Sequence, residues 1–199
     1  MIDFEQLRIA NVVRQMEWPG NEEADLAFRA LEVADEAGEV MGAIKKLERA
    51  RRGIAGSTLD LQDVAEELGD TMIALDLLAN EIKCGPDEFA PSVELQASQS
   101  VQPVMEQALI LDNMVGDLSF AAFLLLAAMS AEGDELKPRE HVIQCMSRVL
   151  ASLSGISETL GIDLGQAVAA KFNKTSERYG MATRFETARR PPSGALRND

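Results

Sequence analysis

The chain has few of the residues that build disulfide frameworks and zinc sites. Among its 199 residues there are two cysteines, Cys84 and Cys145, and one histidine, His141. The cysteines lie far apart and have no His or Cys partner at metal-binding spacing, so neither a disulfide framework nor a zinc site is indicated. We expect both thiols to be buried or partly buried and His141 to be structural.

Positive charge is also scarce. Lys and Arg number 19 against 33 Asp and Glu, which gives a formal net charge of −14. Nucleic-acid backbones and anionic membranes would repel such a chain, so we expect neither as a partner. The most apolar run, Phe120 to Met129, is too short to span a bilayer, and no signal-peptide pattern opens the chain. A cytoplasmic location is the expectation.

Aromatic residues make up 5% of the chain, whereas hydrophobic residues make up 46% and long stretches are rich in Ala, Leu, Met, Glu and Lys. This composition favours helix over strand and predicts an all-α fold, a helical bundle. Pro and Gly interrupt the pattern at a few places, such as residues 18–20, 53–56 and 85–86. The predicted helices are 3–17, 25–52, 59–83, 104–131, 139–160 and 164–178.

One domain of residues 1–185 is expected from this length. Its parts are a catalytic half at about 1–86, a degenerate or inserted half at about 101–160 and a closing helix at about 163–179. Residues 87–100 read as an irregular connector with room for one helical turn, and residues 132–138 as a loop. The tail, residues 186–199, is rich in Arg and Pro from Arg189 onward and has no apolar periodicity there. We expect it to be disordered.

Two acidic clusters are the most informative local pattern. Glu36 and Glu39 lie three residues apart on one predicted helix, and Glu67 and Asp70 lie three apart on the next. Residues at this spacing share a helix face, and like charges there repel unless something neutralises them. Both clusters are embedded in apolar helix. A solvated acidic face is the alternative, since exposed glutamates are common on amphipathic helices.

The short connection between these two helices predicts that they pack as antiparallel neighbours, with the carboxylate pairs facing one another. Four such side chains can surround a hard divalent cation, and Mg²⁺ prefers carboxylate oxygens together with substrate phosphate oxygens. Glu32, one turn before Glu36, adds a third carboxylate to that stripe. The pattern predicts metal-assisted phosphate chemistry.

The two halves align weakly as a repeat at an offset of 77 residues, which brings Asp35 onto Asp112 and Asp70 onto Ser147. At this offset helix falls on helix, but each acidic candidate meets a residue that does not ligate a metal well. The second half would then be scaffold. The alternative is an inserted helical hairpin of separate origin.

Four segments resemble the MazG-like group of the all-α nucleoside triphosphate pyrophosphohydrolase superfamily. In the family's order they are residues 28–40 (FRALEVADEAGEV), 44–49 (IKKLER), 66–70 (EELGD) and 170–180 (AKFNKTSERYG). Each motif alone is weak, but four in order with the expected helices are a specific match. With the helices that carry them, they cover about half of the chain.

The resemblance implies hydrolysis of a nucleoside triphosphate between the α and β phosphates, which yields the monophosphate and pyrophosphate. It also implies Mg²⁺ or Mn²⁺ held by Glu36, Glu39, Glu67 and Asp70, with Glu32 as a further ligand or a partner behind them. Glu36 or Glu39 is the candidate for accepting the proton of the attacking water. The substrate is an NTP or dNTP, and family habits favour dGTP.

Basic residues are expected to contact the outer phosphates, because Arg grips phosphate in bidentate fashion and Lys supplies a point charge. Surface charge for solubility is the alternative. Asn173 and Tyr179 are candidates for hydrogen bonds to phosphate or sugar, and Trp18 for stacking on a base or for a core role. The basic candidates are Lys45, Lys46, Arg49, Lys171, Lys174 and Arg178.

One departure from compact members of the family is the long segment between Asp70 and Lys171. The closing helix either packs against the catalytic pair of its own chain or reaches another subunit. Since the family generally forms dimers or tetramers, we expect a homodimer or homotetramer. Alternative functions are a dUTP-specific or phosphoribosyl-nucleotide pyrophosphohydrolase, or a non-enzymatic helical protein whose acidic stripes bind a basic partner.

Overall fold

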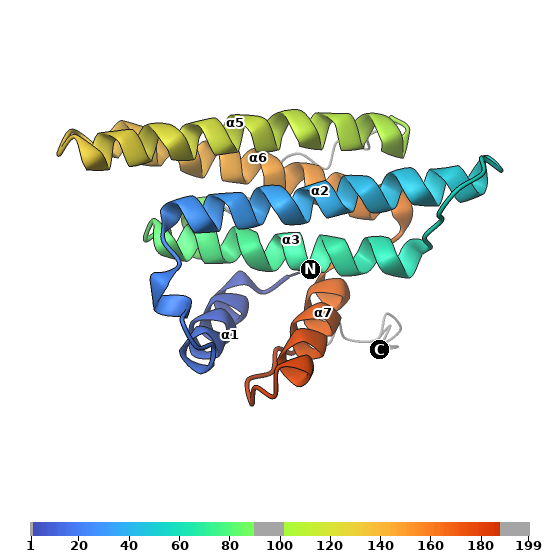
Figure 1. The fold of residues 1–199 in the computed structure, drawn as a ribbon, viewed down its shortest axis with the longest axis horizontal. Coiled ribbons are helices and arrows are strands. Elements are labelled where there is room, and N and C mark those ends of the chain that lie inside the picture. Colours follow the sequence, from blue (N-terminus) through green and yellow to red (C-terminus); the bar gives the residue numbers. More distant parts are fainter. Residues whose placement is uncertain (1, 90–101, 188–199) are drawn as a thin grey trace, which may run out of the picture.

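The computed structural model describes residues 2–89 and 102–187, which form seven α-helices, one short 3-10 helix and no β-strand (Figure 1). The all-α class is therefore confirmed. The elements are α1 (Phe4–Glu17), η1 (Asn21–Glu23), α2 (Leu26–Arg51), α3 (Leu61–Glu81), α4 (Pro86–Phe89), α5 (Val104–Ser130), α6 (Leu136–Leu160) and α7 (Leu164–Arg178).

The helices form three layers (Figure 1). The antiparallel hairpin α2–α3 is the central layer, and the hairpin α5–α6 covers one side of it through contacts of α5 with α2 and of α6 with α3. Helices α1 and α7 pack on the other side, mainly against α3. This arrangement places the acidic segments of α2 and α3 beside the helix that closes the chain.

Aspartate side chains set the starts of four helices. Asp3, Asp25, Asp60 and Asp163 each accept a hydrogen bond from a backbone N–H in the first turn of the helix that follows. Such N-caps contribute about 1 kcal/mol each because they satisfy a donor that has no partner within the helix. The predicted helices are confirmed to within three residues, and the predicted first residues Asp3 and Asp25 are caps.

The loop predicted at residues 132–138 is shorter than expected, because α6 begins at Leu136. Pro138, which falls within the predicted loop, lies in the first turn of α6. A proline is tolerated there because the first backbone N–H groups of a helix have no acceptor within it.

The interior is apolar, and its largest buried side chains come from all three layers. Both cysteines are buried free thiols, as expected, whereas His141 is exposed. The fully buried large side chains are Phe89, Phe172, Leu7, Ile44, Leu68, Met72, Leu75, Leu78, Leu111, Leu118, Met146 and Leu153.

Helix α5 is long and apolar enough to cross a membrane by length and composition, with 33% of its most apolar window buried. The short apolar run noted in the sequence, Phe120 to Met129, is part of this longer helix. Core helices of soluble proteins pass the same test, and α5 packs against α2 and α6.

The connector predicted at 87–100 begins with the single-turn helix α4, and residues 90–101 lie outside the described residues, as do residues 188–199 of the predicted tail. A shift of 77 residues carries α2 onto α5 and α3 onto α6, so helix does fall on helix. A common origin of the two hairpins stays a prediction, and so does the division of the domain into halves.

Candidate metal centre

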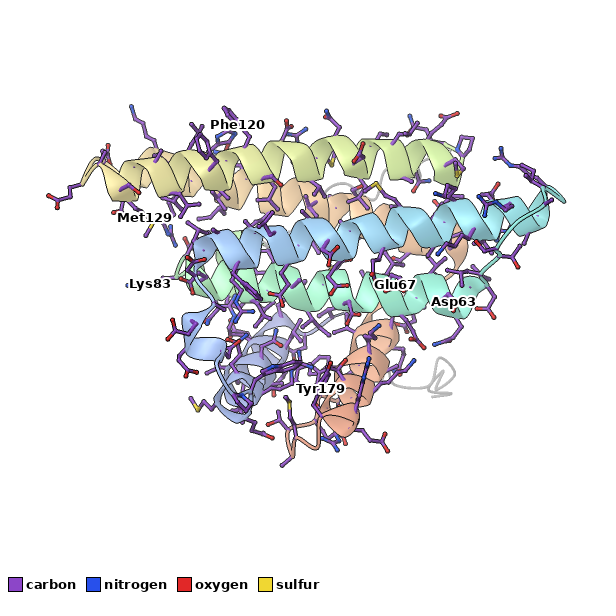
Figure 2. All side chains as sticks on the ribbon, in the orientation of Figure 1. Asp63, Glu67, Lys83, Phe120, Met129 and Tyr179 are labelled. Atoms are coloured by element: carbon purple, nitrogen blue, oxygen red, sulfur yellow. The ribbon has the colours of Figure 1, made fainter. Side chains whose placement is uncertain are left out.

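Three of the four predicted ligands lie together. Glu36 comes from α2, and Glu67 and Asp70 come from α3. Each offers a carboxylate oxygen, and the three oxygens lie within 4.8 Å of one another. Figure 2 labels Glu67 on the part of α3 that α7 approaches. The three residues converge because α2 and α3 pack side by side and because i and i+3 share a face of α3.

Glu39, the fourth predicted ligand, is outside this group of three and is solvent-exposed. Its charge nevertheless raises the pKa of Glu36, Glu67 and Asp70. Glu39 therefore lies beside the cluster, where its side chain also reaches Glu67, and its role as a ligand stays a prediction.

Burial and mutual repulsion both disfavour ionisation in the cluster. The pKa of Glu36 is raised to about 7, first by burial and then by the charges of Asp70 and Glu39. Burial is also the main cause that raises the pKa values of Glu67 and Asp70, against the lowering effect of Lys171. Oε2 of Glu67 is buried and has no hydrogen-bond partner among the described residues. A cation would relieve each of these costs.

Two lysines of α7 face the acidic residues of α3. Nζ of Lys171 lies 2.6 Å from Oδ2 of Asp70 and 4.0 Å from carboxylate oxygens of Glu66 and Glu67. Nζ of Lys174 lies 2.6 Å from Oε2 of Glu66. The closing helix thus packs against the acidic pair of its own chain, which selects one of the two arrangements considered from the sequence.

Gly69 explains how α7 comes so near. A Cβ atom at this position would lie 2.8 Å from the carbonyl oxygen of Ala167 and 3.0 Å from Cβ of Lys171. Only glycine leaves room for this approach. By contrast, a Cβ at Gly38, between Glu36 and Glu39, would meet nothing within 4 Å. The glycine of the second acidic motif therefore positions Lys171 beside Asp70.

A cavity of about 400 Å³ adjoins the cluster, and Glu36 and Asp70 form part of its wall. Other parts of the wall come from the turn between α1 and α2, which includes Trp18 and Asn21, and from Phe28 of α2. The Trp18 ring packs on Tyr179 with ring centroids 4.8 Å apart. The remaining lining residues are Arg14, Gln15, Pro19, Gly20, Glu23, Ala24, Arg29, Glu32, Ile73, Ala74, Leu77 and Thr175.

Two arginines in this wall were not expected from the sequence. The Arg29 guanidinium lies 2.8 Å from Oε2 of Glu32 and donates to the side-chain oxygens of Asn21 and Gln15. Glu32 is thereby held by an arginine at the cavity wall and is not in the group of three carboxylates. The sequence could have indicated Arg29, because this residue lies three residues before Glu32 and seven before Glu36 and so shares their helix face.

Arg14 of α1 is the second. Its guanidinium carbon lies 3.7 Å from the centroid of the Phe172 ring, and it donates to the carbonyl oxygen of Phe172. Burial lowers the pKa of Arg14 to about 10, while the charges of Asp70 and Glu32 oppose that change. Nothing in the sequence marks Arg14, because its proximity to Asp70 depends on how α1 packs.

The predicted basic residues of α2 lie elsewhere. Lys45, Lys46 and Arg49 are not among the residues that line the cavity. The Arg49 side chain donates to the carbonyl oxygen of Ser57 at 2.8 Å, which ties the end of α2 to the loop before α3. A phosphate-binding role for these three residues stays a prediction.

The other candidates at the end of the chain have partners within the protein. Asn173 exchanges two hydrogen bonds with the backbone of Phe185, at 2.9 and 2.8 Å, and so holds the segment after α7. Arg178 lies over the ring of Tyr179, which is 54% exposed. Of the predicted substrate-binding residues, Lys171 contacts the cluster and Trp18 lies in the cavity wall.

No protein-family model, curated protein or solved structure matches this chain.

Proposed function

We propose that this chain hydrolyses nucleoside triphosphates to the monophosphate and pyrophosphate with Mg²⁺ or Mn²⁺. The observation that carries the proposal is the cluster of Glu36, Glu67 and Asp70 at the wall of a cavity of about 400 Å³. The cavity is lined by carboxylates and also by the rings of Trp18 and Phe28. A nucleotide has partners for both, since it carries a phosphate chain and a flat base.

The residues present fit a divalent ion. Three features make this donor set suited to a hard cation: three carboxylate oxygens within 4.8 Å, one buried oxygen of Glu67 without a hydrogen-bond partner among the described residues, and carboxylate pKa values raised by burial and then by mutual repulsion. Glu36, Glu67 and Asp70 would hold the ion. When bound, it supplies charge neutralisation for the phosphates and a more acidic water.

The reaction needs a proton acceptor and a place for the leaving group. In this proposal water attacks the α-phosphorus, the bond to the bridging oxygen breaks, and pyrophosphate leaves with the electron pair. Glu39 is beside the cluster and outside the group of three, so its carboxylate is available to take the proton. Lys171 and Lys174 stand at the α7 side of the cluster, where they can contact the departing phosphates.

The base and sugar would lie toward Trp18 and Phe28. Both rings line the cavity, and the packing of Trp18 on Tyr179 holds the indole in place. Asn21 and Gln15 supply amide groups in the same wall. These groups suit a nucleoside, and they leave the identity of the base to experiment.

The experiment is a pyrophosphate-release assay on all common NTPs and dNTPs, including dGTP and dUTP, and on a phosphoribosyl nucleotide, with Mg²⁺, with Mn²⁺ and with chelator. We expect turnover that depends on the metal, and its loss in Asp70→Asn. Glu81→Gln is the matched control, because Glu81 is an exposed acidic residue of the same helix and lies outside the cluster and the cavity wall.

A second measurement separates the roles of the carboxylates. Calorimetry measures metal binding, which should be lost in Asp70→Asn and kept in Glu39→Gln. Turnover should be lost in both variants. Full activity in folded Asp70→Asn would refute the site. No pyrophosphate from any substrate, together with no metal binding, would favour the alternative of a helical interaction protein.

A further inference from the structure

Helices α5 and α6 form the layer on the side of α2–α3 that faces away from α1 and α7 (Figure 1). The outer face of α5 carries a regular exposed stripe. Its members alternate in steps of four and three residues, which is the seven-residue spacing of a coiled-coil seam. All of them are solvent-exposed, and Figure 2 shows Phe120 standing on the side of α5 away from α2 and α3. The seam consists of Leu109, Asn113, Gly116, Phe120, Phe123 and Ala127.

The apolar side chains here are too many for an ordinary solvated surface. Leu109 is 69%, Phe120 59% and Phe123 60% exposed, and the two Phe rings stack with centroids 6.3 Å apart. Ile110, Leu124 and Met129 on the same helix are also more than a third exposed. At roughly 100 Å² for each of these six side chains, the patch is roughly 600 Å², at the upper end for monomers.

We propose that a second copy of this chain covers the seam, with the two α5 helices antiparallel about a two-fold axis that crosses the seam midway between Gly116 and Phe120. In that arrangement residues whose numbers add to 236 lie opposite one another. Phe120 then faces the partner's Gly116, Leu109 faces Ala127, and Phe123 faces Asn113.

Each of these layers therefore pairs a large side chain with a smaller one. Each pair also joins an a position of one helix to a d position of the other, which is the pairing in antiparallel coiled coils. A Cβ at Gly116 meets nothing within 4 Å in the monomer, so the space it leaves is open to the partner's Phe120. The seam thus has the self-complementary shape of an isologous interface, and two copies that cover the whole patch would bury about 1,200 Å² in total, which is the lower end of the range for specific dimers.

Charge favours a second copy over a lipid surface. Helix α5 contains no Lys or Arg, whereas helices that lie on membranes carry basic residues on their polar face. Its acidic residues are Glu106, Asp112 and Asp117. Asp117, which lies next to the axis, is 2.9 Å from Arg148 of the same chain, so its charge is compensated where the two copies would meet.

The first test is the mass of the full chain in solution, measured by analytical ultracentrifugation over a range of concentrations. We expect a dimer that dissociates at least tenfold more readily in Gly116→Leu and in Phe120→Glu. Gly116→Leu is informative because Gly116 is exposed and a Cβ there meets nothing within 4 Å in the monomer, so thermal stability should not fall. Gly38→Ala, on α2, is the control and should leave the dimer unchanged.

The second test fixes the direction of pairing. The double variant Asn113→Cys/Phe123→Cys should form disulfide-linked dimers under mild oxidation, whereas Asn113→Cys alone should not, because Asn113 faces the partner's Phe123 and not its own copy. Efficient cross-linking of Asn113→Cys alone would overturn the antiparallel arrangement.

A chain that stays monomeric at all concentrations would overturn the proposal, and so would a monomer that binds neutral phosphatidylcholine vesicles through Phe120. Since the seam and the cavity lie on opposite sides of the α2–α3 layer, dissociation should leave the rate of pyrophosphate release per chain unchanged. The two proposals can therefore fail independently.

Discussion

Replacement of Gly69 by alanine tests how α7 is positioned against the acidic cluster. The added Cβ would lie 2.8 Å from the carbonyl oxygen of Ala167 and 3.0 Å from Cβ of Lys171, both closer than such atoms normally pack. Overpacking of this kind costs about 1–3 kcal/mol, whereas the change from Gly to Ala inside a helix gains about 1 kcal/mol. These two contributions oppose each other in Gly69→Ala.

Gly38→Ala isolates the second contribution. Gly38 lies inside α2, and a Cβ there meets nothing within 4 Å. The gain in helix propensity is common to both variants and cancels in their difference. We therefore expect Gly69→Ala to be less stable than Gly38→Ala by about 1–3 kcal/mol.

Urea unfolding followed by circular dichroism measures this difference, provided that the slope of the unfolding free energy is the same in both variants. Since α7 must shift to admit the new methyl group, Lys171 should also move from Asp70, and the KM for the triphosphate should rise in Gly69→Ala alone. Equal stability of the two variants would show that α7 does not pack on Gly69, and the explanation of the Lys171–Asp70 contact would fall with it.

Three further predictions concern single side chains of the cluster, the α2–α3 loop and the cavity. In metal-free buffer the raised pKa of Glu36 means that the folded chain binds this proton more tightly than the unfolded chain, so its contribution to stability declines as the pH rises from about 4.5 to about 7. The free energy of unfolding of Glu36→Gln should therefore equal that of the wild type near pH 4.5 and exceed it at pH 8 by on the order of 1 kcal/mol after solvent screening, as measured by urea unfolding. Excess Mg²⁺ should make the wild type the more stable of the two at pH 8. Arg49→Ala should lower stability by at most about 1 kcal/mol through loss of its bond to Ser57 and leave kcat/KM unchanged; a tenfold fall in kcat/KM would instead support contact with phosphate. Trp18→Ala should raise KM by about tenfold or more, since stacking on a base is worth about 1–3 kcal/mol, whereas Trp18→Phe should recover most of the affinity; an unchanged KM in both variants would move the base elsewhere.

Local sequence signals predicted most of the helices, because the rules that govern helix ends act over a few residues. An aspartate that caps the first turn and a Pro or Gly that interrupts the last one are visible without knowledge of the fold. The same rules led to the error at the start of α6, since Pro138 can stand in a first turn as well as in a loop.

The candidate site was predicted only where it depends on one helix or on one pair of adjacent helices. Spacing along α2 and α3 was enough to bring Glu36, Glu67 and Asp70 together. It was not enough to place Arg49, thirteen residues and about 20 Å along α2 from Glu36. Helical periodicity assigns a residue to a face, but it does not say how far along the helix a cavity extends.

The sequence by itself determined that the chain is helical, where most helices begin and end, and that two acidic faces lie on neighbouring helices, because these properties follow from composition, capping and periodicity. Only the tertiary structure decided which cations meet these carboxylates and where the cavity lies. Lys171 reaches Asp70 from a helix 101 positions later, through a contact that Gly69 permits. Arg14 and Trp18 reach the cavity because α1 folds back on α3. Such long-range packing depends on the fit of whole surfaces, which no local pattern records.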